Sequence, residues 1–138
     1  MIINGYKIGP GAKLSGANLS GTRLPLRRFF RGVDLSGADL SDADLSNSNL
    51  LFRANLHNAD LSNANLQKAD LTGANLCSTN MIGADLRRAH LSNVSVDYGT
   101  LLVYAKLHEV NLTGVNFINF SNEAFQFAEW NEVKENGE

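Results

Sequence analysis

The sequence is poor in several features that would point to a common class of protein. It has one cysteine, Cys77, which excludes an internal disulfide framework and fits a reducing, cytoplasmic location. Charge of one sign is lacking too, because 12 Lys and Arg offset 14 Asp and Glu, a formal net charge of -2. No run approaches the roughly 18 apolar residues of a membrane helix, and residues 1–10 do not resemble a signal peptide. We therefore expect one soluble domain without a membrane span or an overall basic surface for nucleic acid.

A leucine recurs at every fifth residue over most of the chain. Residues 59–78 show the pattern: Ala-Asp-Leu-Ser-Asn, Ala-Asn-Leu-Gln-Lys, Ala-Asp-Leu-Thr-Gly and Ala-Asn-Leu-Cys-Ser. We call the leucine position i; the residue at i−2 is then small, usually Ala, and the residue at i−1 is usually Asn or Asp. Between Leu14 and Phe117 there are 21 such units, and 17 of them carry Leu at position i. Such a repeat predicts a solenoid.

A period of five fits neither a helix nor a flat strand. Successive leucines would be rotated by about 500° along a helix, and they would alternate between the two faces of a strand. The period does fit a coil in which each unit forms one short side and turns a corner. The side chains at i and i−2 then point inward, while Asn, Asp, Gly and Ser suit the outward and corner positions.

The tandem A-(D/N)-L-x-x pattern runs from Ala12 to about Asn119 and resembles the pentapeptide repeat family. The resemblance implies an all-β solenoid, a right-handed quadrilateral β-helix of about five coils with four units per coil. It also suggests a bacterial, notably cyanobacterial, source. We expect an N-terminal lead-in or cap at residues 1–11, the β-helix at 12–119, and a C-terminal capping helix and acidic tail at 120–138.

Three steps between units take six residues instead of five, namely 29 to 35, 50 to 56 and 101 to 107. Each begins with an apolar pair: Phe29-Phe30, Leu50-Leu51 or Leu101-Leu102. We expect the extra residue to form a bulge at a corner, with the first member of each pair facing inward. The irregular segment around Pro25, residues 25–33, either stays in the column or leaves it as a loop.

The C-terminal segment carries a helical pattern. Ser121 is a suitable N-cap for a helix that runs to about Lys134 and ends the β-helix. Two interpretations of its aromatic side chains stay open: a cap over the last coil, or a homodimer contact. The residues concerned are Phe120, Phe125, Phe127 and Trp130.

The sequence predicts no catalytic, cofactor or metal site. One face would stack Ser15, Ser36, His57, Cys77, Asp97 and Ile118 on successive coils. The order of His57, Cys77 and Asp97 is wrong for nucleophilic catalysis, because the base must lie between nucleophile and acid. These residues would also lie on an exposed convex face without a pocket. No phosphate-binding loop is present.

One coil combines arginine with phenylalanine, as protein interfaces and nucleic-acid platforms do. The candidate protein-interaction residues are Arg27, Arg28, Phe30, Arg31, Phe52 and Arg53. The other interpretations are an irregular coil packed under a loop and a weak nucleic-acid site.

We therefore expect a non-catalytic structural module that binds an unknown protein partner. The family resemblance implies an alternative, a DNA mimic that binds DNA gyrase or another topoisomerase through its outward aspartates. Charge places this second: residues 1–11 carry +1, residues 12–119 carry +1 and residues 120–138 carry -4. A DNA mimic needs a dense negative surface on the column itself.

Overall fold

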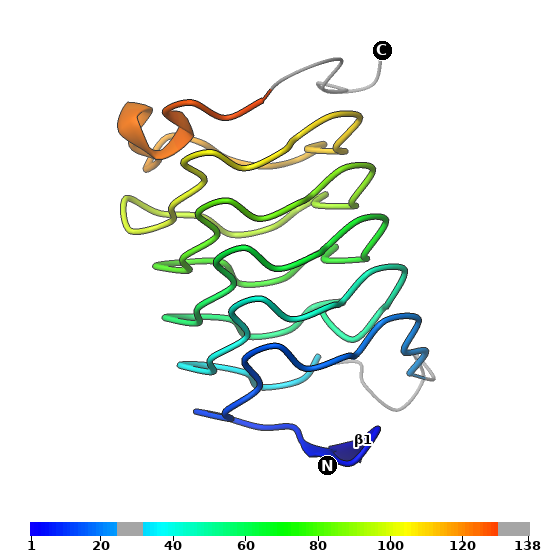
Figure 1. Ribbon diagram of the computed structural model, residues 1–138. Coiled ribbons are helices and arrows are strands. Elements are labelled where there is room, and N and C mark those ends of the chain that lie inside the picture. The colour runs from blue at the N-terminus through cyan, green and yellow to red at the C-terminus, as the bar shows by residue number, and fades with distance from the viewer. Residues whose placement is uncertain (25–31, 130–138) are drawn as a thin grey trace.

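The computed structural model, which describes residues 1–24 and 32–129, is a column of stacked coils with the two ends of the chain at its opposite ends (Figure 1). Regular elements are few: strands β1 (Ile2–Ile3) and β2 (Tyr6–Lys7), and the 3-10 helix η2 (Asn122–Phe125). None of the described residues forms a helix long and apolar enough to cross a membrane. The column is held together by single-residue parallel bridges between coils.

These bridges join the i−1 residues of neighbouring coils. Their partners are 20 residues apart in regular coils, as in Asp60 and Asn80, and 21 apart where a six-residue step intervenes. Four ladders result: Lys13, Asp39, Asp60, Asn80 and Leu101; Asn18, Asp44, Asn65, Asp85, Lys106 and Glu129; Asp70, His90 and Asn111; and Asp34, Asn55, Asn75 and Ser95. The column is therefore four-sided, with four units per coil, as the repeat predicts.

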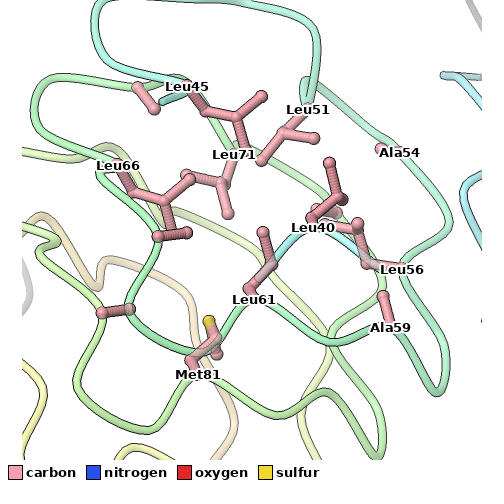
Figure 2. Packing of buried hydrophobic residues seen from close by; sticks show 14 of the residues in the cluster. Leu40, Leu45, Leu51, Ala54, Leu56, Ala59, Leu61, Leu66, Leu71 and Met81 are labelled. Atoms are coloured by element: carbon pink, nitrogen blue, oxygen red, sulfur yellow. The ribbon is translucent and has the colours of Figure 1, made fainter. Parts of the chain in front are cut away.

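The core is a stack of leucines at position i, interleaved with the small residues at i−2 (Figure 2). The leucines from Leu35 to Leu91 and the alanines between them are buried almost completely. Burying one leucine contributes about 1.5–3 kcal/mol. Because each coil contacts only its neighbours, these contributions add up along the column.

The outward positions have a backbone role. At i+2 the chain takes a left-handed conformation, as at Asn63, with φ of 55°, and the N–H of the next residue, Ala64, donates to the carbonyl of Leu61. This is the geometry of a type II turn, which favours Gly and Asn. At i−1 the side chain of Asp60 accepts a hydrogen bond from the Ser62 N–H at 2.9 Å. The recurrence of Gly, Asn and Asp thus follows from the turn at each corner.

The six-residue steps differ from the expectation. Leu50 and Leu51 are both buried, so the second step turns both members of its pair inward. In the third, Leu102 is buried while Leu101 takes the bridging position opposite Asn80. The prediction that Leu101 faces inward is wrong, because the extra residue lies before Leu101. Phe29 and Phe30 lie outside the described residues, as does most of the 25–33 segment.

The predicted C-terminal helix from Ser121 to Lys134 is also wrong. The Ser121 side chain does accept from the Glu123 N–H, but η2 ends at Phe125, and Phe127 has φ of 57°. The chain then resumes the repeat: Ala128 N–H donates to the Phe125 carbonyl, and Glu129 bridges to Lys106. Hydrogen bonds to the coil below therefore replace the helix up to residue 129, where the described part ends.

At the other end, β1 and β2 form an antiparallel hairpin at the base of the column (Figure 1). Its turn residues Asn4 and Gly5 both have positive φ, 50° and 84°, which the tight turn requires. Ile8 follows the hairpin and is buried in the core.

Candidate functional site

The predicted Arg-Phe coil lies largely outside the described residues: Arg27, Arg28, Phe30 and Arg31 belong to segment 25–31. Of its other members, Phe52 is half-buried and Arg53 is exposed. A Cβ atom on Gly32 would collide with the Arg53 carbonyl. The backbone that follows the Arg-Phe segment therefore packs directly on Arg53, and the interaction site itself stays a prediction.

The predicted stack of polar residues is partly formed. His57 Nδ1 lies 3.0 Å from the carbonyl oxygen of Cys77 on the next coil. Ser15 was placed below Ser36, but it lies below Ser41, with 3.0 Å between their hydroxyls, because the intervening coil is longer than the regular 20 residues. Burial, and to a lesser degree the charge of Asp97, raises the pKa of the Cys77 thiol. Among the described residues, no group of three His, Cys, Asp or Glu could hold a metal ion.

Asp97 has a structural role in this stack. Its Oδ1 accepts hydrogen bonds from the N–H groups of Ser78 at 2.7 Å and Gly99 at 3.0 Å, and from Thr100 Oγ1 at 3.2 Å. In the regular coils a backbone carbonyl takes the place opposite Ser78, as for Asn58 and Cys77. Burial raises the pKa of Asp97, but these hydrogen bonds outweigh it and hold the pKa below its usual value. The carboxylate thus closes the corner where the extra residue is accommodated.

The aspartates named for DNA mimicry have a similar role. Each accepts, through Oδ1, the backbone N–H of the residue two positions later; they are Asp34, Asp39, Asp44, Asp60, Asp70 and Asp85. Asn residues at the same position make the same bond, as Asn65 does with the Gln67 N–H. The bond needs an acceptor and not a charge, so the fold leaves the charge of each face free to vary.

The C-terminal end carries an aromatic surface, which we define as Tyr98, Tyr104, Phe117, Ile118 and Phe127. Tyr104 and Phe127 occupy the same turn position on successive coils, and their rings stack with centroids 5.1 Å apart. Their exposed fractions are 57% and 62%. Of the other predicted contact residues, Phe120 and Phe125 pack against the core with centroids 4.5 Å apart, whereas Trp130 lies outside the described residues.

The sequence interpretation missed a second surface, at the corner that follows the ladder of Asp85 and Lys106. We call it the basic corner: Lys68, Arg87, Arg88, Lys106, His108 and Glu109, with Gln67 and Glu129 completing the lining of a hollow of about 450 Å³. The signal was present in the sequence, because Gln67-Lys68, Arg87-Arg88 and His108-Glu109 are spaced by 20 and 21 residues. Stacking the i+1 and i+2 positions of all four corners would have found it.

Ion pairs organise the basic corner. Arg87 binds Asp85 with both ends of its guanidinium, at 2.8 and 2.6 Å. Arg88 Nε lies 2.6 Å from Glu109 Oε2 on the next coil. Burial raises the pKa of Asp85, but Arg87 and Lys106 bring it below its usual value. The hydrogen bond to Glu109 raises the pKa of Arg88. The corner therefore holds fixed charges of both signs with a cationic excess.

Comparison with known proteins supports the solenoid. Residues 29–50 and 54–93 match the model of pentapeptide repeats in eight copies. The chain is similar to the crystal structure of a pentapeptide repeat protein from Nostoc Pcc 7120, with a TM-score of 0.59 and 41% identity, covering 69% of this chain and 71% of that chain.

Two further solved structures are similar. The pentapeptide repeat protein Rfr23 of the cyanobacterium Cyanothece 51142 is 29% identical, covers 85% of this chain and 86% of its own, and has a TM-score of 0.49. One from the Arabidopsis thaliana thylakoid lumen is 33% identical, covers 71% of this chain and 66% of its own, and has a TM-score of 0.42. Among curated proteins there is no significant match.

Proposed function

This chain belongs to the pentapeptide repeat family, and from that premise we propose that it is a non-catalytic protein-interaction module. Proteins of this family are generally non-catalytic. The observation that carries the proposal is the aromatic surface at the C-terminal end, where large apolar side chains are exposed together. Exposed aromatic groups of this kind are enriched at protein interfaces. The single, half-buried Cys77 supports a reducing, cytoplasmic location.

The test is affinity capture with a variant that removes the aromatic surface and keeps the backbone. Tyr104→Asn with Phe127→Asn suits this purpose, because Asn adopts the left-handed conformation that both residues have. We expect proteins retained by the wild type to be lost from the variant. Asn47→Gly changes the same turn position on another corner and serves as the control. If the variant retains the same proteins as the wild type, the aromatic surface is not the interaction site.

A second copy of the chain is a further candidate partner for this surface, as a homodimer through the C-terminal end. The flat stack of Tyr104 on Phe127 supports it, because an exposed pair of stacked rings presents an apolar face that a copy can match. Light scattering is expected to give twice the 15.0 kDa of the chain for the wild type, and the single-chain mass for Tyr104→Asn/Phe127→Asn. A wild-type mass of one chain at every concentration would exclude the dimer.

A DNA mimic that binds gyrase or another topoisomerase remains the alternative, and no specific observation favours it. The six aspartates described above serve the turns, and basic residues offset the acidic ones along the column. We expect no inhibition of DNA gyrase in a supercoiling assay.

A further inference from the structure

The basic corner departs from the repeat at the position where departure is most costly. Seven described residues other than Gly, Asn and Asp have φ between 54° and 60°: Arg53, Lys68, Ser78, Arg88, Tyr104, Glu109 and Phe127. Three of them, Lys68, Arg88 and Glu109, occupy successive coils of the basic corner. The Lys68 N–H donates to the Arg87 carbonyl, and the Arg88 N–H donates to the His108 carbonyl.

The left-handed conformation costs an ordinary residue about 1–2 kcal/mol, and Gly or Asn much less. The ladder below the corner has the favourable residues, Gly21 and Asn47, at this position. Folding alone would therefore favour Asn over Lys68 and Arg88. Backbone strain concentrated in one place indicates a role for the side chains that cause it.

The side chains of the corner are arranged for an anionic partner. All the residues that line the hollow are polar or charged. Among the described residues, neither Lys68 nor Lys106 forms an ion pair, whereas Arg87 and Arg88 are paired with Asp85 and Glu109. With His108 neutral, four cationic groups face three carboxylates, those of Asp85, Glu109 and Glu129.

The mixture of charges favours a polypeptide over a nucleic acid. The three carboxylates would repel a continuous row of phosphates, and no aromatic side chain lines the hollow to stack a base. An extended acidic peptide avoids both difficulties. It can place its carboxylates opposite Lys68 and Lys106, while its backbone N–H groups donate to Glu109 and Glu129.

We propose that the basic corner is the docking surface for an extended, acidic segment of a partner protein. The inference rests on the proposed interaction function but uses residues separate from the aromatic surface. Lys68→Asn with Arg88→Asn can therefore fail while Tyr104→Asn with Phe127→Asn succeeds, and the reverse.

The probe is a fluorescein-labelled peptide of alternating Glu and Ser, followed by fluorescence anisotropy at low and at physiological salt. We expect salt-sensitive binding that Lys68→Asn/Arg88→Asn weakens by about tenfold or more. The variant should keep or raise the wild-type melting temperature, because Asn suits both turns. Lys13→Asn/Arg53→Asn removes the same charge elsewhere, includes one left-handed residue, and should leave binding unchanged.

Four outcomes would overturn the proposal. The first is no binding of the Glu-Ser peptide, and the second is equal binding of a Gln-Ser peptide. The third is tighter binding of single-stranded DNA or RNA that the same variant abolishes, which would make the corner a nucleic-acid site. The fourth is unchanged peptide binding with a lower melting temperature, which would make the Arg88–Glu109 pair a purely structural contact between coils.

Discussion

Between residues 32 and 96 the column exposes no large hydrophobic side chain, whereas between Tyr98 and Phe127 five are exposed. The middle coils follow the repeat closely: position i is apolar and buried, and most turns hold Gly, Asn or Asp. The last coils keep the buried positions but place Tyr104, Glu109 and Phe127 at the turns. The inward positions thus carry the fold, and the turn positions are where this chain becomes particular.

The additive stability of a solenoid explains why the end can differ from the middle. Each coil contacts only its neighbours, so a change at the last coil leaves the middle coils undisturbed. An extra residue or a strained turn is therefore tolerated near an end if its local hydrogen bonds are completed, as Asp97 completes those of Ser78.

The largest expected difference between the two regions concerns the core leucines. Leu66→Ala should lower the free energy of unfolding by about 2–5 kcal/mol, since it leaves a cavity between two complete coils; Leu66 is fully buried. Leu112→Ala, at a half-buried position of the last coil, should cost clearly less. Urea unfolding measures both, and equal losses would contradict the proposed division.

Removing the Asp97 carboxylate should have the next largest effect. Asp97→Ala leaves the Ser78 N–H without its acceptor, and we expect a loss of about 1.5–3 kcal/mol at neutral pH. Because the pKa of Asp97 is lowered in the folded protein, its contribution is present above the unfolded value of about 3.9. It is lost as the pH falls through the lower folded value. Urea unfolding of both proteins against pH should therefore converge in acid; a constant difference would argue against this role.

A smaller gain is expected in the middle of the column. The Ser48 hydroxyl is buried, and no hydrogen-bond partner for it exists among the described residues. Ala is the usual residue at this i−2 position, so Ser48→Ala should stabilise the protein by about 1 kcal/mol. Thermal unfolding measures the shift. Thr100→Ala is the matched opposite case, because the Thr100 hydroxyl donates to the Leu76 carbonyl at 2.8 Å, and that variant should melt lower.

The sequence predicts the inward positions well because one physical requirement, burial, acts on them at every turn. It predicts the four-sided coil and the i−2 alanines for the same reason. The C-terminal helix fails because Phe120, Ala124 and Phe127 also suit a helical period. The competing signal was the five-residue spacing of Phe120, Phe125 and Trp130. In the structure Phe125 does continue the repeat.

The surfaces are harder to predict because their residues come from separate coils. Lys68, Arg88 and Glu109 meet only if each six-residue step is placed correctly. Leu101 shows how easily a step is misplaced, since hydrogen bonding rather than hydropathy decides which leucine of the pair bridges to Asn80. Asp97 gives no sequence signal that its side chain replaces a backbone carbonyl.

The most direct test of the division between fold and surface replaces four turn residues at once. Lys68→Asn, Arg88→Asn, Tyr104→Asn and Phe127→Asn together remove the outward groups and leave residues that suit a left-handed turn. Thermal unfolding of this variant should give a melting temperature equal to or above that of the wild type, with loss of protein capture and of Glu-Ser peptide binding. A clearly lower melting temperature with capture and peptide binding intact would show that these side chains serve the fold.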